Sequence, residues 1–321
     1  MTHFYKGKKV LVTGGTGLIG RAIVKKLLEF GAEVTIASLD DLNLFPGVRF
    51  KKVDLTCFDD TVEVMRDVDC VVHAAGIKGS IEVTLSRPAS FFVPMARFNL
   101  NVLEAARLNA ISNLVYMSSI GAYSSAEIFV EDVNDEGPPM DRFPGWAKRM
   151  AELQIEAYRK EYSLDWSIVR PCNVYGPGDN FDPDNAMVIP SLMMKVERGD
   201  DPVLVWGDGS AIRDFAYSDD IAEGTLLALQ HGTRGSYVNL GSGEGYAISE
   251  LVDSLSKIVN FNYEFDSTKS GGFPRRIMNI NRAREWLGYD PKIDLRTGLE
   301  LTWNWFQENK DEYLRRHNYF R

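Results

Sequence analysis

Long apolar runs, positive charge and cysteine are all scarce in this chain of 321 residues. No apolar stretch reaches the roughly 20 residues that a membrane-spanning helix requires. Lys and Arg number 36 against 45 Asp and Glu, which gives a formal net charge of -9. Binding to nucleic acid needs clustered Lys and Arg, so this balance argues against a nucleic-acid partner. We therefore expect neither a membrane protein nor a nucleic-acid-binding protein.

The three cysteines show no spacing typical of a metal site or a disulfide framework. Cys57, Cys70 and Cys172 are far apart in the chain, and we expect them to be buried free thiols in the reducing cytoplasm. Thr2 to Lys9 is polar and basic, and the apolar run after it is short and broken by glycine. This segment is not expected to be a secretory leader, and no metal site is predicted.

The clearest motif lies near the start of the chain. Val10 to Val12 predicts a strand, three spaced glycines follow, and helical periodicity begins at Leu18. Gly14 permits a sharp turn, Gly17 lets the backbone approach a pyrophosphate, and Gly20 lets the helix pack closely on the strand. The N–H groups of the first helical turn then face the phosphates. The motif predicts a dinucleotide site; the alternative is a strand–turn–helix connection without a ligand.

The end of the second expected strand indicates which dinucleotide binds. An acidic residue there accepts hydrogen bonds from the ribose of NAD, whereas a nearby Arg receives the extra phosphate of NADP. The segment from Ala37 to Asp41 contains no Lys or Arg, and Asp40 and Asp41 would repel a phosphate. These residues favour NAD. The alternative is that both acids only solvate a loop.

Strand and helix patterns alternate through the first half of the chain. We expect strands at 33–38, 50–54, 70–75, 114–119 and 166–170, and helices at 98–106 and 141–162. This order predicts an α/β fold with a Rossmann-type, doubly wound parallel sheet. Asp54 and Leu55 would then lie beside the adenine. His73, alone on a buried strand, is more typical of a structural residue than of a catalytic one.

The last third of the chain has a different sequence pattern, with short strands, Gly-rich turns and helices. Strands are expected at 203–206 and 237–240, and helices at 248–258 and 297–308. This region predicts a smaller α/β cap over the carboxyl ends of the sheet, where open α/β folds bind ligands. Residues 1–175, with parts of 213–245, are expected to form the NAD-binding domain. Residues 176–321 are expected to form mainly the nucleotide-sugar-binding domain.

Several motifs in the same order resemble the extended short-chain dehydrogenase/reductase family of nucleotide-sugar epimerases, dehydratases and reductases. They are the glycine motif, Ser119 four residues before Tyr123, Lys148, Arg170-Pro171 with Tyr175-Gly176-Pro177, Arg213-Asp214-Phe215 with Asp219-Asp220-Ile221-Ala222, and Asn239 to Gly243. The resemblance covers nearly the whole chain. Gly178 to Pro183 and Val188-Ile189-Pro190 are most similar to the members of this family that act as GDP-fucose synthases.

The resemblance implies a set of site residues. Those expected to bind NAD are Gly14, Thr16, Gly17, Leu18, Ile19, Gly20, Asp40, Asp54, Leu55, Ala74, Ala75, Gly76, Lys148, Pro171, Asn173 and Val174. Those expected to bind the nucleotide sugar are Lys78, Ser119, Tyr123, Asn173, Asn180, Val188 and Arg213. A guanidinium fork suits phosphate oxygens, so Arg213 is the expected diphosphate partner; the alternative is an ion pair that links the domains.

The sequence departs from the family at the position of its acid/base residue. The resemblance implies a Tyr four residues before Lys148, where this chain has Pro144, and a Pro has no proton to give. GDP-fucose synthases also use a Cys two places after the Ser and a His before Val-Ile-Pro, which are here Gly121 and Met187. These departures argue against epimerisation at two carbons.

Hydride chemistry remains possible with the residues that are retained. Ser119 can hydrogen-bond the reacting oxygen, and Lys148 can hold the nicotinamide ribose. Tyr123 is expected to line the sugar pocket, and it is one substitute proton carrier; a relay of water, the ribose hydroxyl and Lys148 is another. Loss of a positioned acid/base costs about 10²–10⁴-fold in rate.

Three hypotheses about function follow from these observations. The first is an NAD-dependent dehydrogenase or 4-keto reductase acting at C4 of a nucleotide-linked hexose or heptose, with GDP the first choice of nucleotide, for surface polysaccharide sugars. The second is a 4-epimerase or 4,6-dehydratase that recycles its NAD. The third is a non-catalytic NAD(H)-binding protein. Family resemblance also implies a homodimer built on the helices around 98–108 and 144–162, although their exposed apolar residues could equally belong to the core.

Overall fold

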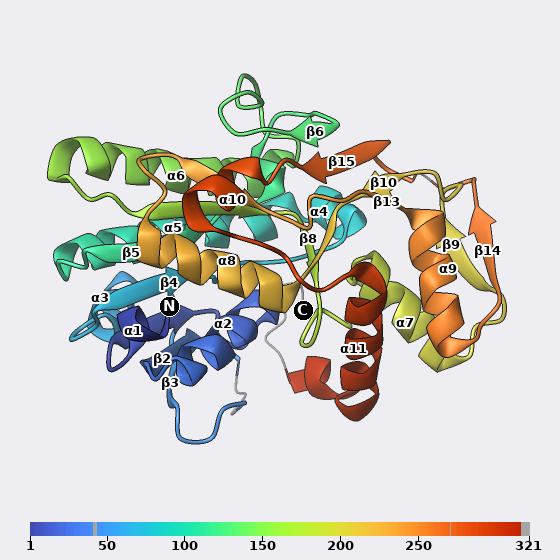
Figure 1. The fold of residues 1–321 in the computed structure, drawn as a ribbon, viewed down its shortest axis with the longest axis horizontal. Helices are drawn as coiled ribbons and strands as arrows, with labels where there is room; N and C mark the ends of the chain where they lie inside the picture. The colour runs from blue at the N-terminus through green and yellow to red at the C-terminus, as the bar shows by residue number, and fades with distance from the viewer. Residues whose placement is uncertain (41–43, 270, 316–321) are drawn as a thin grey trace.

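The computed structural model describes residues 1–40, 44–269 and 271–315 (Figure 1). Its centre is a seven-stranded sheet in which every neighbouring pair is parallel, with the order β12-β7-β5-β4-β1-β2-β3. The strands are β1 (Lys9–Thr13), β2 (Glu33–Ser38), β3 (Arg49–Lys52), β4 (Cys70–His73), β5 (Asn113–Met117), β7 (Ser167–Pro171) and β12 (Tyr237–Leu240). The strand order reverses between β1 and β4, and this is where a doubly wound sheet binds its ligand. The predicted Rossmann fold class is confirmed.

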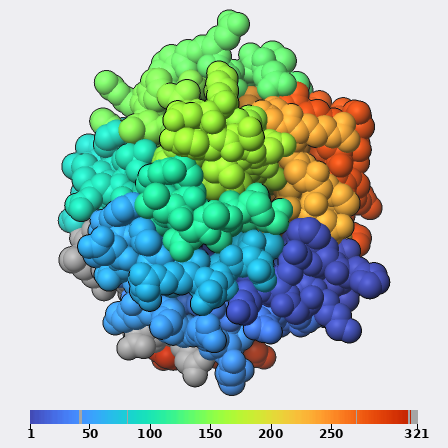
Figure 2. Space-filling view, turned by 90° about the vertical axis from the view of Figure 1, so that its left-hand side faces the viewer, coloured from blue at the N-terminus to red at the C-terminus, as the bar shows by residue number. Residues whose placement is uncertain are grey.

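Helices cover both faces of this sheet. All residues of β4 and β7 are buried, and successive side chains of a strand point to opposite faces, so both faces are covered. Helix α2 (Leu18–Glu29) packs against α8 (Ser218–His231), and α5 (Pro88–Leu108) packs against α6 (Arg142–Tyr162). The shorter α3 (Phe58–Val64) packs on α5. Figure 2 views the molecule from the side where α5 and α6 end, and the two helices lie next to each other there.

A second hydrophobic core lies at the other end of the molecule, on the right of Figure 1. Helices α7 (Val188–Arg198), α9 (Ile248–Val259) and α11 (Leu295–Glu308) supply much of it. The strands around this core form two short parallel pairs, β8 (Asn173–Tyr175) with β11 (Phe215–Tyr217) and β9 (Val203–Trp206) with β14 (Tyr263–Asp266). The domain boundary at 175/176 stays a prediction. Tyr175, the last residue of the expected NAD-binding domain, packs in this second core.

A four-stranded sheet brings together segments that are distant in the sequence. Its order is β13 (Tyr246–Ala247), β10 (Ile212–Arg213), β15 (Arg275–Met278) and β6 (Ile128–Phe129). The remaining short elements are α1 (Thr2–Tyr5), α4 (Ile81–Ser86), the 3₁₀ turns η1 (Ile120–Ala122) and η2 (Glu312–Arg315), and α10 (Asn281–Leu287). This sheet connects the loop after β5 to the second half of the chain, and it thereby places residues from both halves around one site.

Several boundaries differ from the sequence predictions for local reasons. The helix expected at 98–106 begins at Pro88, which occupies its first turn, where a missing N–H costs nothing. The strand expected at 50–54 ends at Lys52, because the Asp54 carboxylate accepts hydrogen bonds from Thr56 and forms a turn.

Cys57 was expected to be buried but is exposed at the start of α3, whereas Cys70 and Cys172 are buried; all three are free.

No helix within residues 1–40, 44–269 and 271–315 is both long enough and apolar enough to cross a bilayer. The same residues contain no cluster of three or more His, Cys, Asp or Glu side chains that could hold a metal ion.

Candidate active site

The glycine turn after β1 forms a cradle at the sheet's reversal point. Gly14 has φ +67°, and a Cβ there would lie 2.7 Å from the Cα of Ala75 at the end of β4. A Cβ on Gly20 would overlap the carbonyl oxygen of Gly14. Gly17 precedes α2 with no side-chain cap, so the first-turn N–H groups at Leu18 and beyond have no partner within the helix. The space and the donors both fit a pyrophosphate.

The end of β2 is tied to this turn by hydroxyl groups. The Thr16 hydroxyl lies 2.7 Å from that of Ser38 and donates to Asp40 Oδ2 at 2.6 Å. Asp40 therefore lies beside the glycine turn, where the ribose of an adenosine would be. Asp41, the second acid named from the sequence, lies outside the described residues. These contacts fit NAD at this end of the cradle.

The other residues expected around the adenine and the nicotinamide follow neighbouring strands. Asp54 is exposed, whereas Leu55 is buried. Ala74 and Ala75 are half-buried directly after β4, and Gly76 is exposed. Pro171 and Val174 are buried on either side of the break between β7 and β8. The structure thus brings these residues to the carboxyl edge of the sheet, and their contact with a bound dinucleotide stays a prediction.

His73 is a structural residue. It is fully buried, with Nδ1 2.8 Å from the Thr13 hydroxyl and Nε2 2.9 Å from Asn99 Oδ1. Burial, reinforced by the charge of Lys148, lowers the pKa of the imidazole to about 3. A neutral, doubly bonded ring that holds β1, β4 and α5 together agrees with the structural interpretation made from the sequence.

Ser119 and Lys148 lie on two elements that meet beyond the end of β5. Ser119 precedes η1, and its hydroxyl accepts the N–H of Gly121 at 3.0 Å. Lys148 lies on α6, and its ammonium donates to the carbonyl of Met117 at 2.7 Å. Burial lowers the pKa of this ammonium to about 8, and Glu152 one turn along the helix opposes that shift. The Lys148 ammonium is also 3.9 Å from the Cβ position of Gly76, which follows β4 on the other side of the cradle from β2.

Pro144 lies in the first turn of α6, as its sequence position predicted. The turn begins after Asp141, and Pro144 is its third residue. A phenol at this position would lie one helical turn before Lys148. The family's acid/base group is therefore absent from its usual place.

Tyr123 requires a correction. It was expected to line the sugar pocket, but it is fully buried and its hydroxyl donates to Asn239 Oδ1 at 2.7 Å. Burial raises the pKa of this phenol above its ordinary value. A buried phenol with a bonded hydroxyl is not available to a substrate, because the ring packs on Phe129 and on the guanidinium of Arg170.

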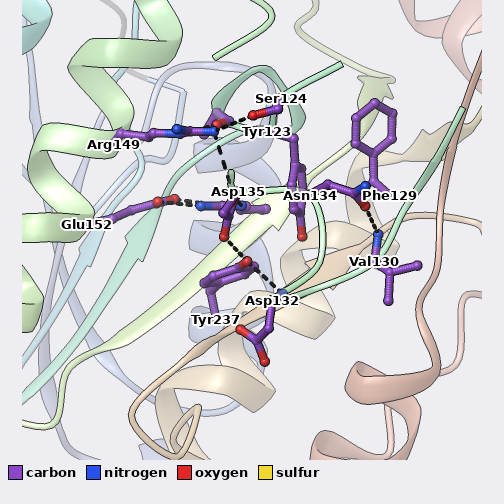
Figure 3. Close-up of polar contacts among 12 residues, drawn as sticks. Tyr123, Ser124, Phe129, Val130, Asp132, Asn134, Asp135, Arg149, Glu152 and Tyr237 are labelled. Atoms are coloured by element: carbon purple, nitrogen blue, oxygen red, sulfur yellow. Dashed lines mark hydrogen bonds and ion pairs between the residues drawn. The ribbon is translucent and has the colours of Figure 1, made fainter. Parts of the chain in front are cut away.

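Figure 3 shows the polar cluster that surrounds Tyr123, which the sequence reasoning missed. The buried Arg170 donates to Glu152 through Nε and Nη2, and to Asp135 at 2.7 Å. Its guanidinium lies 3.8 Å from the ring of Tyr237, whose hydroxyl donates to Asp135. The cluster holds the loop after η1 against α6. Arg170-Pro171 was quoted only as a motif, and nothing in the sequence indicated which carboxylates it meets.

Two arginines lie side by side on the four-stranded sheet. Arg213 on β10 is paired in register with Arg276 on β15. Arg213 donates to the carbonyls of Ile212 at 2.8 Å and Gly271 at 3.1 Å. Burial, together with the charge of Arg276, lowers the pKa of Arg213 to about 10. Arg276, which the sequence analysis did not single out, lies 3.8 Å from Asp141; two adjacent guanidinium groups suit a diphosphate.

The remaining residues expected around the sugar lie in, beside or against the loop between β8 and α7. Lys78 donates to Asp179 at 2.7 Å and keeps a partly exposed side chain. Asn180 donates to the carbonyl of Asn185 within its own loop, and Asn173 donates to the carbonyl of Asp214. Val188 is half-buried at the start of α7. These residues lie together, although several of their polar groups already have protein partners.

Comparisons with known proteins agree with this geometry. The profile of the NAD dependent epimerase/dehydratase family matches residues 10–241. GDP-L-fucose synthase of Escherichia coli K12 is 30% identical over 326 residues, covering 95% of this chain and 98% of the relative. GDP-L-fucose synthase 1 of Arabidopsis thaliana is 30% identical over 318 residues, covering 95% and 94%. The structure of Thermus thermophilus UDP-glucose 4-epimerase in complex with NAD is 29% identical, with a TM-score of 0.80 and coverage of 93% and 99%. The GDP-L-fucose synthases and the UDP-glucose 4-epimerase are named for nucleotide-sugar substrates. The chain belongs to the NAD dependent epimerase/dehydratase family.

Proposed function

We propose that the protein is an NAD-dependent oxidoreductase acting at C4 of a nucleotide-linked hexose or heptose, as a 4-dehydrogenase or 4-keto reductase. The observation that carries this proposal is that Lys148 is bonded to the carbonyl of Met117, two residues before Ser119, at the end of β5 and next to a glycine cradle that fits a dinucleotide. Bound NAD would supply the hydride acceptor. The chain's own groups would bind and orient the dinucleotide and the sugar, and would exclude water from around them.

The expected roles of these two side chains follow from their contacts. The Ser119 hydroxyl, held by the N–H of Gly121, is placed to donate to an oxygen on the sugar. The buried Lys148 ammonium keeps a donor available beyond its bond to Met117, since an ammonium has three N–H groups. It would hold the nicotinamide ribose and stabilise negative charge on the sugar oxygen.

A GDP-linked sugar is our first choice of substrate. Its support is the similarity to GDP-L-fucose synthases over almost the full chain and the paired Arg213 and Arg276, which suit a diphosphate. Gly121 and Met187 stand where the resemblance implies the epimerisation pair, so we propose hydride chemistry without double epimerisation. The product would serve surface polysaccharide synthesis in the cytoplasm.

We propose a homodimer as the working unit. Leu100 and Leu108 on α5 and Trp146, Met150 and Leu153 on α6 are between 38% and 65% exposed. The two helices pack on each other and present these side chains outward. Exposed apolar patches of this kind are typical of protein–protein contacts. Sedimentation analysis of the wild type and of a Leu153→Glu variant would test the proposal.

Incubation of the purified protein with NAD and a panel of GDP-, UDP- and dTDP-linked sugars tests the function. We expect the absorbance of reduced nicotinamide to rise with at least one GDP-linked sugar. Absence of a signal in both directions across the panel would contradict the proposal. A sugar that changes without net reduction of NAD, seen by NMR, would instead favour an epimerase or dehydratase, which the similarity to the Thermus epimerase also supports.

A further inference from the structure

Asp141 is the feature that the proposed chemistry leaves unexplained. It precedes α6 as the N-cap residue, yet its side chain makes no capping hydrogen bond. An N-cap Asp usually accepts the N–H of the second or the third helical residue. Here the third residue is Pro144, which has no N–H. The substitution that removes the family's phenol therefore also removes one of the two usual partners of the Asp141 carboxylate.

The freed carboxylate turns towards the Ser119 turn. A Cβ built on Gly121 would overlap Asp141 Oδ2 and lie 3.0 Å from its Cβ and Cγ. The backbone supports this approach, since the N–H of Asp141 donates to the carbonyl of Gly121 at 3.4 Å. Gly121 is also the residue whose N–H holds the Ser119 hydroxyl. The absence of a side chain at 121 thus makes room for a carboxylate two residues from Ser119.

The surroundings of Asp141 suit a group that exchanges protons with a substrate. Its side chain is 41% exposed, so a ligand can reach it. The half of the side chain that packs against protein loses hydration, and this partial burial raises the pKa of the carboxyl; the guanidinium of Arg276 at 3.8 Å opposes that shift. Arg276 lies in register with Arg213, so a sugar diphosphate held by these arginines would bring its sugar close to Asp141.

We propose that Asp141 is a catalytic residue that takes the proton of the sugar hydroxyl during oxidation, in place of the phenol absent at Pro144. This inference rests on the proposed function. In the step, the sugar O–H bond breaks and its proton passes to Asp141, the C4–H bond breaks with its electron pair leaving as hydride to the oxidised nicotinamide dinucleotide, and the C4–O bond becomes a carbonyl.

The test compares Asp141→Asn and Asp141→Glu with the wild type in single turnovers, using the sugar identified from the panel. The Asn variant should lose about 10²–10⁴-fold in the rate of hydride transfer, and the Glu variant should recover part of it. Binding of NAD and of the nucleotide sugar, measured by calorimetry, should change little in either variant. Asp132→Asn is the matched control, since Asp132 pairs with Arg282 at 2.5 Å on an exposed surface.

The pH dependence separates a proton carrier from a merely structural ion pair. Oxidation needs the ionised carboxylate, so the wild-type rate should fall as pH drops through the Asp141 pKa, which burial places above the ordinary aspartate value. The Asn variant should lack this acidic limb. A structural role would lower thermal stability and leave the limb in place.

Gly121→Ala provides a second, independent variant. The added methyl would displace the Asp141 carboxylate without removing its charge. We expect a rate loss close to that of Asp141→Asn, and no further loss when the two changes are combined.

The outcomes distinguish the inference from the function beneath it. An inert wild type overturns both. An active wild type with an equally active Asn variant and an unchanged pH profile overturns only the role of Asp141. Solvent deuterium that enters a carbon beside C4 in the wild type, and not in the Asn variant, would show that Asp141 acts on carbon and would overturn the proposed hydroxyl proton transfer.

Discussion

The glycine turn at residues 14–20 and the Ser119 turn at residues 119–123 form the two ends of the proposed site, and they are built differently. The first works through backbone: Gly20 has no space for a Cβ against the Gly14 carbonyl, and the donors are main-chain N–H groups. The second works through side chains that come from separate segments, such as Lys148 on α6 and Asp141 before it. A site built from backbone groups depends on the spacing of residues along one segment. In a site built from side chains, a functional group can instead be supplied by a different segment of the chain.

The largest expected effect tests the side-chain end. Lys148→Met should lower turnover by about 10²–10⁴-fold, as expected for loss of a positioned catalytic group. Calorimetry of the unliganded protein should show a second effect of the substitution, on the pH dependence of stability. Because the pKa of Lys148 is lowered to about 8, the unfolded chain retains a proton between pH 8 and about 10.4 that the folded chain has released. Wild-type stability should therefore gain with rising pH in that window, and the variant should lack this gain.

The exposed Lys25 on α2 supplies the control for that measurement. Lys25→Met should leave turnover as in the wild type. If Lys148→Met retained full turnover, Lys148 would have no role in chemistry, and the comparison between the two ends would fail.

The second prediction concerns the arginines that would hold the diphosphate. Arg213→Ala and Arg276→Ala should each raise KM for the nucleotide sugar by about 10–100-fold, since a hydrogen bond to a charged group is worth about 1.5–3 kcal/mol. Affinity for NAD should not change. Arg198→Ala, which removes an exposed pair with Asp200 in the same half of the molecule, is the control. Equal losses of NAD and sugar affinity would indicate a folding defect instead.

The third prediction tests the backbone end. Gly20→Ala forces a methyl group against the Gly14 carbonyl, and overpacking of this kind costs about 1–3 kcal/mol of stability. We expect a lower melting temperature and weaker NAD binding in a thermal-shift titration. Gly271→Ala is the matched control, because its Cβ would meet only ordinary contacts at 3.8 Å and beyond. A Gly20 variant with unchanged NAD affinity would show that close helix packing is not needed for the cradle.

The smallest expected effect sharpens the correction at Tyr123. Tyr123→Phe removes the hydrogen bond to Asn239 and should cost about 0.5–1.5 kcal/mol of stability. Turnover should be unchanged, since the buried phenol does not face the substrate. A large loss of turnover with unchanged stability would restore Tyr123 as the proton carrier.

The sequence was informative wherever function depends on residues that are close along the chain. The glycine motif, the end of β2 at Asp40 and the first-turn position of Pro144 all lie where periodicity and spacing placed them. Tyr123 misled because its spacing from Ser119 matched the family, while its burial depends on Arg170 and Asn239, which lie 47 and 116 positions away.

The sequence by itself determined the parallel sheet, the dinucleotide cradle and the loss of a phenol at Pro144, because each depends on residue type and local order. Only the tertiary structure decided that Asp141 enters the space left at Gly121 and that Arg276 joins Arg213. The physical reason is that these contacts arise where chain segments cross, and a spacing rule along one segment carries no information about the partner that folding brings to it.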